Sequence, residues 1–155
     1  MKLMLIRHAH AEEKREDLED IKRHLTEKGI ESFKSLMPEL KEKLEPLAER
    51  NLLLWSSPAN RAMETAEIVA DALQIPINSI EGFIYEGDFK TLSNRIQVED
   101  DETTLMVVGH EPSLSEWAEE MTGEPTKIRK GDMLHFEVTQ KFPLKAELQW
   151  TVSAK

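Results

Sequence analysis

The stretch LMLIRH, residues 3–8, is an apolar run that ends at an arginine and a histidine. A second stretch, LMVVGH at residues 105–110, has the same form. Continuous runs of Leu, Ile, Val and Met are typical of parallel strands whose sheet is covered by helices on both faces. In open α/β sheets the ligand crevice lies at the carboxyl ends of such strands. The two stretches therefore predict an α/β sheet whose crevice holds Arg7, His8 and His110, a set of side chains that indicates an anion site.

The rest of the chain alternates between further strand and helix patterns, with no repeat and no linker. We therefore expect one domain over residues 1–155, with three α/β/α layers and a mostly parallel central sheet. A helical region that begins near Leu25 and continues to Leu47 should kink or split at Pro38. Pro112 suits the first position of a helix through Met121, which Gly123 ends. The remaining expected elements are strands at 2–7, 52–55, 77–80 and 104–109, helices at 61–73 and 88–98, and a final antiparallel strand pair at 133–138 and 146–152.

Composition narrows the class of protein. The 155 residues carry a formal net charge of −10, which opposes general nucleic-acid binding because that binding neutralises phosphates with Lys and Arg. The chain contains no cysteine, which excludes disulfides, thiolate catalysis and Cys-ligated metals. Neither a signal peptide nor a stretch of membrane-spanning length is visible, so we expect a soluble, cytoplasmic protein without a membrane partner.

A third cluster of polar residues follows the strand at 52–55. Ser56 and Ser57 come directly after it, and Arg61 lies near the start of the next helix, one turn before Thr65. Helix amino termini attract phosphate, and the arginine fork matches phosphate oxygens in bidentate geometry. Two other interpretations remain. Arg61 could pair with Glu64 or Glu67 on its own helix, and Ser57 is a better helix cap than phosphate ligand.

At this point the chain resembles the histidine phosphatase, or phosphoglycerate-mutase-like, superfamily. Three motifs carry the resemblance in the expected order: Arg7-His8, then Ser57-Pro58-x-x-Arg61-Ala62-x-x-Thr65-Ala66, and then Gly109-His110-x-Pro112. The short chain and the segments 25–29 and 109–112 are most similar to the SixA branch, the small phosphohistidine phosphatases. One departure is Ala9, which stands where family members usually have glycine.

The resemblance implies a mechanism and a set of site residues. His8 would attack phosphorus and carry the phosphoryl group covalently, while Arg7, Arg61 and His110 hold the transferring oxygens. Ser57 would be a further substrate contact, and the family needs no metal or cofactor. Glu86 lies in the stretch where a general acid for an ester leaving group could occur.

The expected substrate is a phosphohistidine on a protein, and the sequence leaves the alternatives open. One is a phosphomonoesterase for a small phosphorylated metabolite, which would need a proton donor such as Glu86. The other is a non-catalytic phosphate-binding module, against which the complete set of site residues argues. The sequence does not specify the physiological substrate, the pathway or the oligomeric state.

Overall fold

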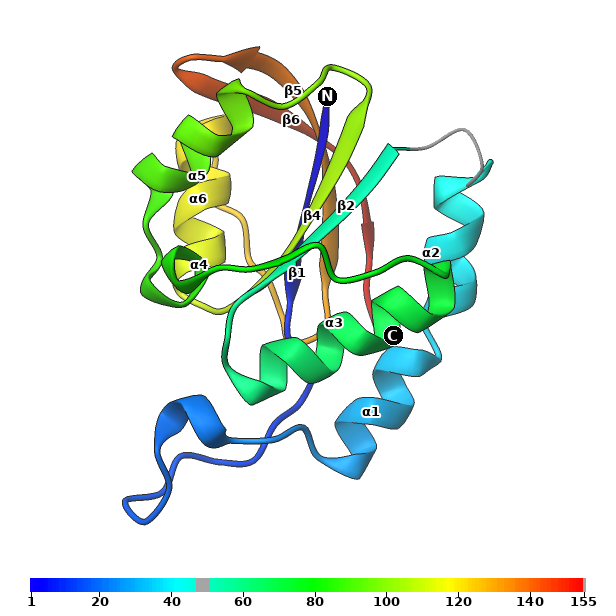
Figure 1. The fold of residues 1–155 in the computed structure, drawn as a ribbon, viewed down its shortest axis with the longest axis vertical. Coiled ribbons are helices and arrows are strands. Elements are labelled where there is room, and N and C mark those ends of the chain that lie inside the picture. The colour runs from blue at the N-terminus through cyan, green and yellow to red at the C-terminus, as the bar shows by residue number, and fades with distance from the viewer. Residues whose placement is uncertain (47–50, 155) are drawn as a thin grey trace.

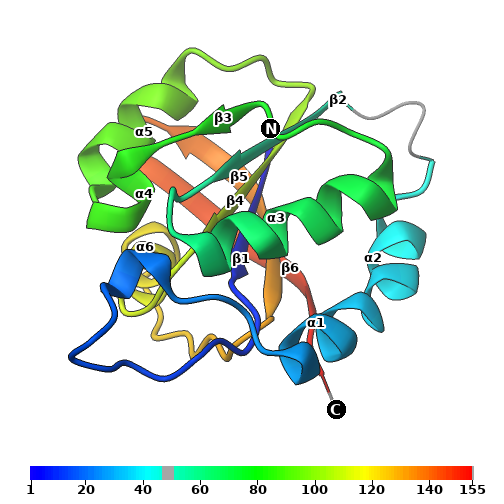
Figure 2. The same cartoon turned by 60° about the horizontal axis from the view of Figure 1, so that its bottom comes forward.

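The central sheet contains six strands within residues 1–46 and 51–154, the part of the chain that the computed structural model describes. Their order is β3-β2-β4-β1-β5-β6 (Figures 1 and 2). The four strands from β3 to β1 are parallel, and β5 pairs antiparallel with both β1 and β6. The strands are β1 (Lys2–Arg7), β2 (Asn51–Ser56), β3 (Ser79–Ile80), β4 (Thr103–Gly109), β5 (Met133–Lys141) and β6 (Leu144–Val152).

Helices cover both faces of the sheet, which confirms the expected three-layer α/β/α architecture (Figures 1 and 2). One layer contains α1 (Glu27–Lys34), α2 (Met37–Leu44) and α3 (Asn60–Leu73). The other contains α4 (Gly82–Glu86), α5 (Phe89–Gln97) and α6 (Ser113–Thr122). A short 3-10 helix, η1 (Asp20–Lys22), lies in the long connection that follows β1.

The strand side chains alternate between two separate cores. Leu3 and Leu5 of β1 pack toward α4, α5 and α6, whereas Met4 and Ile6 pack toward α1, α2 and α3. All four are fully buried, because each face of the sheet has its own helical cover. The unbroken apolar run at 3–6 therefore reflects burial on both faces.

Strand register brings the predicted site segments to one edge of the sheet. β4 lies between β1 and β2, with Arg7 opposite Gly109 and Ser56 opposite Val108. Just past the strands, the His8 amide donates to the Gly109 carbonyl over 3.1 Å, and the Ser57 amide donates to the Val108 carbonyl over 3.0 Å. The ends of β1, β2 and β4 are thus joined by backbone hydrogen bonds where the chain turns from strand to loop.

Most predicted elements are confirmed, with differences at their ends. Pro38 does split the helical region and lies in the first turn of α2, while Leu47 is outside the described residues. Pro112 is the N-cap of α6 and not its first residue, and Gly123 ends that helix with a φ of 79°. The final strands are longer than predicted and meet at Phe142 and Pro143.

The helix α4 was not predicted, since five residues are too few to show a helical period. No helix among the described residues has the length and apolar character needed to cross a membrane.

Candidate active site

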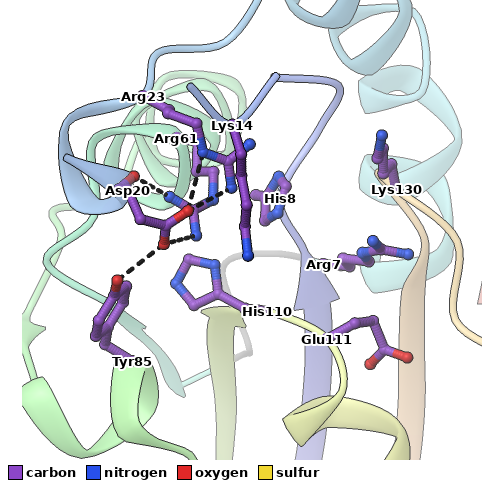
Figure 3. A pocket seen from close by; sticks show the side chains of 10 residues that line it. All are labelled: Arg7, His8, Lys14, Asp20, Arg23, Arg61, Tyr85, His110, Glu111 and Lys130. Atoms are coloured by element: carbon purple, nitrogen blue, oxygen red, sulfur yellow. Dashed lines mark hydrogen bonds and ion pairs between the residues drawn. The ribbon is translucent and has the colours of Figure 1, made fainter. Parts of the chain in front are cut away.

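A cleft of about 490 Å³ opens at the carboxyl ends of β1 and β4. Figure 3 shows its side chains, which come from the strand ends, the connection after β1, the first turn of α3, α4 and the loop before β5. Cationic groups outnumber anionic ones in it, although the whole chain is strongly acidic. The lining residues are Arg7, His8, Lys14, Asp20, Arg23, Arg61, Tyr85, His110, Glu111 and Lys130.

His8 is held as a neutral imidazole with one free nitrogen. Its Nδ1 lies 2.7 Å from the carbonyl oxygen of Ala9. A carbonyl oxygen can only accept, so Nδ1 carries the proton and Nε2 keeps its lone pair. Burial, opposed by that hydrogen bond and reinforced by the charge of Arg61, lowers the pKa of His8 from 6.5 to about 4. The His8 ring is therefore neutral near pH 7, with a lone pair on Nε2.

His110 is the second imidazole of the cleft, with its ring centroid 5.3 Å from that of His8. Its Nε2 lies 2.7 Å from the hydroxyl oxygen of Ser57. That oxygen also accepts from the amide of Ala59, so its own proton is available to His110 Nε2. Burial and the charge of Arg61 lower the pKa of His110 to about 3. The neutral ring then carries its proton on Nδ1, which is buried and has no hydrogen-bond partner among the described residues.

Arg7 and Arg61 are likewise held by hydrogen bonds, which run from their terminal nitrogens to protein oxygens. Arg7 donates from Nη1 to the carbonyl of Ile128 over 2.9 Å. Arg61 donates from Nη1 to the carbonyl of Asp20 over 2.7 Å and from Nη2 to its carboxylate over 3.0 Å. In both arginines Nε is buried without a partner in the described part of the chain. Burial lowers the pKa of Arg7, whereas the charges of Glu111 and Asp132 raise it.

Asp20 joins three cleft residues through its carboxylate (Figure 3). Arg23 donates to Oδ1, while Arg61 and Tyr85 donate to Oδ2. Burial works against ionisation of Asp20, but the hydrogen bonds from Tyr85 and Arg61 outweigh it and keep the pKa of the carboxyl far below its ordinary value. The ring of Tyr85 stands edge-on to His110 at 5.4 Å between centroids, which links this network to the second imidazole.

The structure brings together four of the predicted site residues and places the other two elsewhere. Arg7, His8, Arg61 and His110 all line the cleft. Ser57 is fully buried behind it, where its hydroxyl contacts His110 and accepts from the Ala59 amide. The expected substrate contact of Ser57 is thus a contact to a cleft residue in this structure.

Glu86 is the other displaced residue. It is exposed at the last position of α4 and does not line the cleft, whereas its neighbour Tyr85 does. The general-acid role of Glu86 therefore stays a prediction, and no contact between Glu86 and the cleft supports it. The alternative pairing of Arg61 with Glu64 is absent, because Glu64 contacts His24 and the Leu25 amide.

Several lining residues have no counterpart in the sequence prediction. They are Lys14, Asp20, Arg23, Tyr85, Glu111 and Lys130. Of these residues, Glu111 was the easiest to identify from the sequence, because it directly follows His110. The others lie in charged loops or in a five-residue helix, where no periodicity separates a cleft residue from a solvated one.

The arrangement suits a tetrahedral oxyanion beside the neutral imidazole of His8. Three nitrogen donors in side chains that line one cleft are buried and have no partner in the described part of the chain: Arg7 Nε, Arg61 Nε and His110 Nδ1. Buried donors without partners are costly, so an anionic ligand that accepts from them is favoured. The described residues contain no group of three His, Asp or Glu side chains that could hold a metal ion.

Comparisons with known proteins agree with this geometry. Residues 3–124 match the family model of the histidine phosphatase superfamily (branch 1). An uncharacterised protein of Picosynechococcus sp. is 31% identical over 142 residues, which cover 86% of this chain and 83% of the relative.

Solved structures share the fold at lower identity. The protein histidine phosphatase SixA, solved with tungstate, has a TM-score of 0.82 and 24% identity over 99% of this chain and 97% of that one. A mycobacterial glucosyl-3-phosphoglycerate phosphatase has a TM-score of 0.73 and 10% identity, and the match covers 99% of this chain and 98% of that one.

Proposed function

The chain belongs to the histidine phosphatase superfamily, and from this premise we propose that it hydrolyses phosphohistidine on a protein through a phospho-His8 intermediate. The observation that supports the proposal best is the ring of donors around His8. Arg7 and His110 each use one nitrogen to hold position and Arg61 uses two, and each side chain leaves another nitrogen buried without a partner among the described residues. A phosphoryl group would satisfy these donors in front of a neutral imidazole.

In the first step, His8 Nε2 attacks the phosphorus atom. The bond between phosphorus and the substrate imidazole breaks, and its electron pair stays with the departing nitrogen; the substrate ring, protonated on its other nitrogen, leaves as a neutral imidazole. The proton on His8 Nδ1 remains hydrogen-bonded to the Ala9 carbonyl, which keeps the ring oriented during the transfer. Donors on Arg7, Arg61 and His110 stabilise the charge on the equatorial oxygens of the transition state.

In the second step, water attacks phospho-His8. A new P–O bond forms, the P–N bond breaks, the electron pair returns to His8 Nε2, and both protons of the water stay with the departing phosphate. The products are inorganic phosphate and the neutral histidine with which the cycle began. Splitting one displacement into two allows the same donors to serve both steps. The positive groups of the cleft supply the charge stabilisation, so the proposed route uses no metal.

The carboxylates of the cleft support an imidazole leaving group over an alkoxide. An alkoxide is strongly basic and needs a proton donor, whereas an imidazole needs little help. Asp20 has its pKa far below the ordinary value and is hydrogen-bonded to Arg61 and Tyr85. Both oxygens of Glu111 are engaged by Ser115. The structural similarity to the SixA protein histidine phosphatase points toward the same substrate class.

Matched peptides test this proposal. We expect a phosphohistidine peptide to be hydrolysed with a kcat/KM at least about a hundredfold above that of the same peptide carrying phosphoserine. His8→Ala should abolish turnover of both. His10→Ala is the matched control, because His10 is exposed in the same connection and contacts Thr26 instead of the cleft.

The other outcomes identify the alternative functions. Faster hydrolysis of the phosphoserine peptide, or of small phosphate esters, would indicate a phosphomonoesterase. Tight binding of inorganic phosphate and of both peptides without turnover would indicate a phosphate-binding module.

A further inference from the structure

The connection after β1 contributes one carboxylate to the wall of the cleft, and that carboxylate has no free acceptor site. Asp20 Oδ1 receives Nε and Nη2 of Arg23 at 3.0 and 2.8 Å. Its Oδ2 receives Nη2 of Arg61 at 3.0 Å and the hydroxyl of Tyr85 at 2.8 Å. An ionised carboxylate offers about four lone-pair sites, so these donors occupy it completely.

Two direct chemical roles are thereby excluded for Asp20. It holds no proton near neutral pH, because hydrogen bonds from Tyr85 and Arg61 overcome the effect of burial on its pKa. It therefore cannot protonate a leaving group. It also cannot accept a hydrogen bond from the substrate without giving up one of its present donors.

The remaining role acts through Arg61. The guanidinium is a planar, rigid fork, so fixing its two terminal nitrogens also fixes the direction of the third. Asp20 fixes both, one through its backbone carbonyl and one through its carboxylate. Arg61 Nε is left buried and unpartnered within the described residues, in a side chain that is only 5% exposed.

We propose that Asp20 is a positioning residue for phosphoryl transfer, which clamps the far end of Arg61 and so holds its guanidinium in place in the cleft. This inference rests on the proposed function for its catalytic meaning. Arg23 and Tyr85 in turn donate hydrogen bonds that hold Asp20 in place. The connection after β1 therefore helps to position the cationic side chains of the cleft.

A simple charge effect predicts the opposite sign, which makes the inference testable. Asp20 is an anion in a cleft for anions, and on charge alone its removal should speed turnover and strengthen phosphate binding. Loss of positioning should slow turnover despite the more favourable charge, because small displacements of a binding group reduce rate steeply.

Asp20→Asn separates these effects, with phosphoramidate as the minimal P–N substrate. We expect kcat/KM to fall at least about tenfold. Asp17→Asn, in the same connection but exposed and paired with Arg15, should match the wild type. In the Arg61→Ala background, Asp20→Asn should cost less than about twofold, since its target is gone. An undiminished cost in that background, or an Asp20→Asn enzyme as fast as the wild type, would overturn the inference while leaving the proposed function intact.

A second measurement does not depend on turnover. The ¹⁵N relaxation of Arg61 Nε reports whether its N–H vector is rigid on the picosecond-to-nanosecond timescale. We expect a rigid vector in the wild type and in Asp17→Asn, and a mobile one in Asp20→Asn at unchanged thermal stability. A rigid Arg61 Nε in Asp20→Asn contradicts the clamp even if the chain proves to hydrolyse no phosphorylated substrate.

Discussion

Ser57 lines no part of the cleft, yet its hydroxyl determines which nitrogen of His110 carries the proton. The hydroxyl accepts from the Ala59 amide and lies 2.7 Å from His110 Nε2. Nδ1 is then the protonated nitrogen, and it is the one left without a partner. A fully buried side chain thus sets the protonation of a ring that lines the cleft.

Ser57→Ala should therefore reduce activity without adding bulk to the cleft. Removing the hydroxyl leaves His110 Nε2 unpartnered and frees the ring, a loss of about 1–2 kcal/mol, or about tenfold in kcat/KM. Steady-state kinetics with phosphoramidate would measure it. Ser56→Ala is the matched control, because Ser56 is equally buried but bonds to the Ser57 carbonyl. Equal losses in the two variants would mean that packing, and not His110, is responsible.

The sequence was informative for those side chains that follow a strand or begin a helix. Arg7, His8 and His110 follow apolar runs, so their meeting at one sheet edge was predictable. Asp20 was not, because it ends a run of similar charged residues, and only the fold places it against Arg61, 41 positions away. Tyr85 and Glu86 are adjacent on α4, but only Tyr85 lines the cleft.

At the scale of elements, α3 anchors the connection that carries Asp20. Glu64 of α3 accepts from the Leu25 amide at 2.7 Å and pairs with His24 Nδ1 at 2.8 Å. The pairing raises the pKa of His24, so the ion pair is complete below the ordinary histidine pKa and is lost as the pH rises through the raised one. The hydrogen bond from the Leu25 amide to Glu64 does not depend on the proton of His24, so it persists over the same pH range.

Glu64→Gln tests this anchor. The amide side chain pairs less strongly with His24, so the connection loosens, and kcat/KM should fall about two- to fivefold with little change in thermal stability. The effect should be larger at pH 6 than at pH 8, because the ion pair contributes at the lower pH. Glu67→Gln, exposed one turn away on α3, should behave as the wild type. A loss in Glu64→Gln that does not depend on pH would contradict the role of the ion pair.

Element boundaries show what periodicity can and cannot predict. The buried strands were located by composition, since a strand covered on both faces has no polar side to interrupt it. The helix α4 shows no period over its five residues. Pro112 illustrates a smaller difference, because proline tolerates the N-cap of α6 as well as the first helical position.

Over the whole molecule, burying two imidazoles at one sheet edge makes stability depend on pH. Burial lowers the pKa of His8 from 6.5 to about 4 and that of His110 to about 3. The unfolded chain therefore binds more protons than the folded one as the pH falls below 6.5. Stability is full above that pH and is lost progressively as the pH falls toward the two folded values.

We expect His8→Gln to reduce this sensitivity to acid. Between pH 7 and pH 5, the free energy of unfolding of the wild type should fall by about 2 kcal/mol more than that of the variant. Urea unfolding at the two pH values would measure it. His10→Gln is the control, since His10 is exposed. If His8→Gln and the wild type lose equal stability, the imidazole of His8 is not protected from protons in the folded state.

The most direct measurement is to trap the enzyme during turnover and locate the phosphoryl group. Rapid mixing with a radiolabelled phosphohistidine peptide, followed by an alkaline quench and mass spectrometry, should give one acid-labile phosphoryl group on His8. The label should form and decay as fast as turnover, and His8→Ala should show neither label nor product. A label on any other residue, or substantial turnover by His8→Ala, would contradict a covalent phosphoryl transfer through the imidazole at the end of β1.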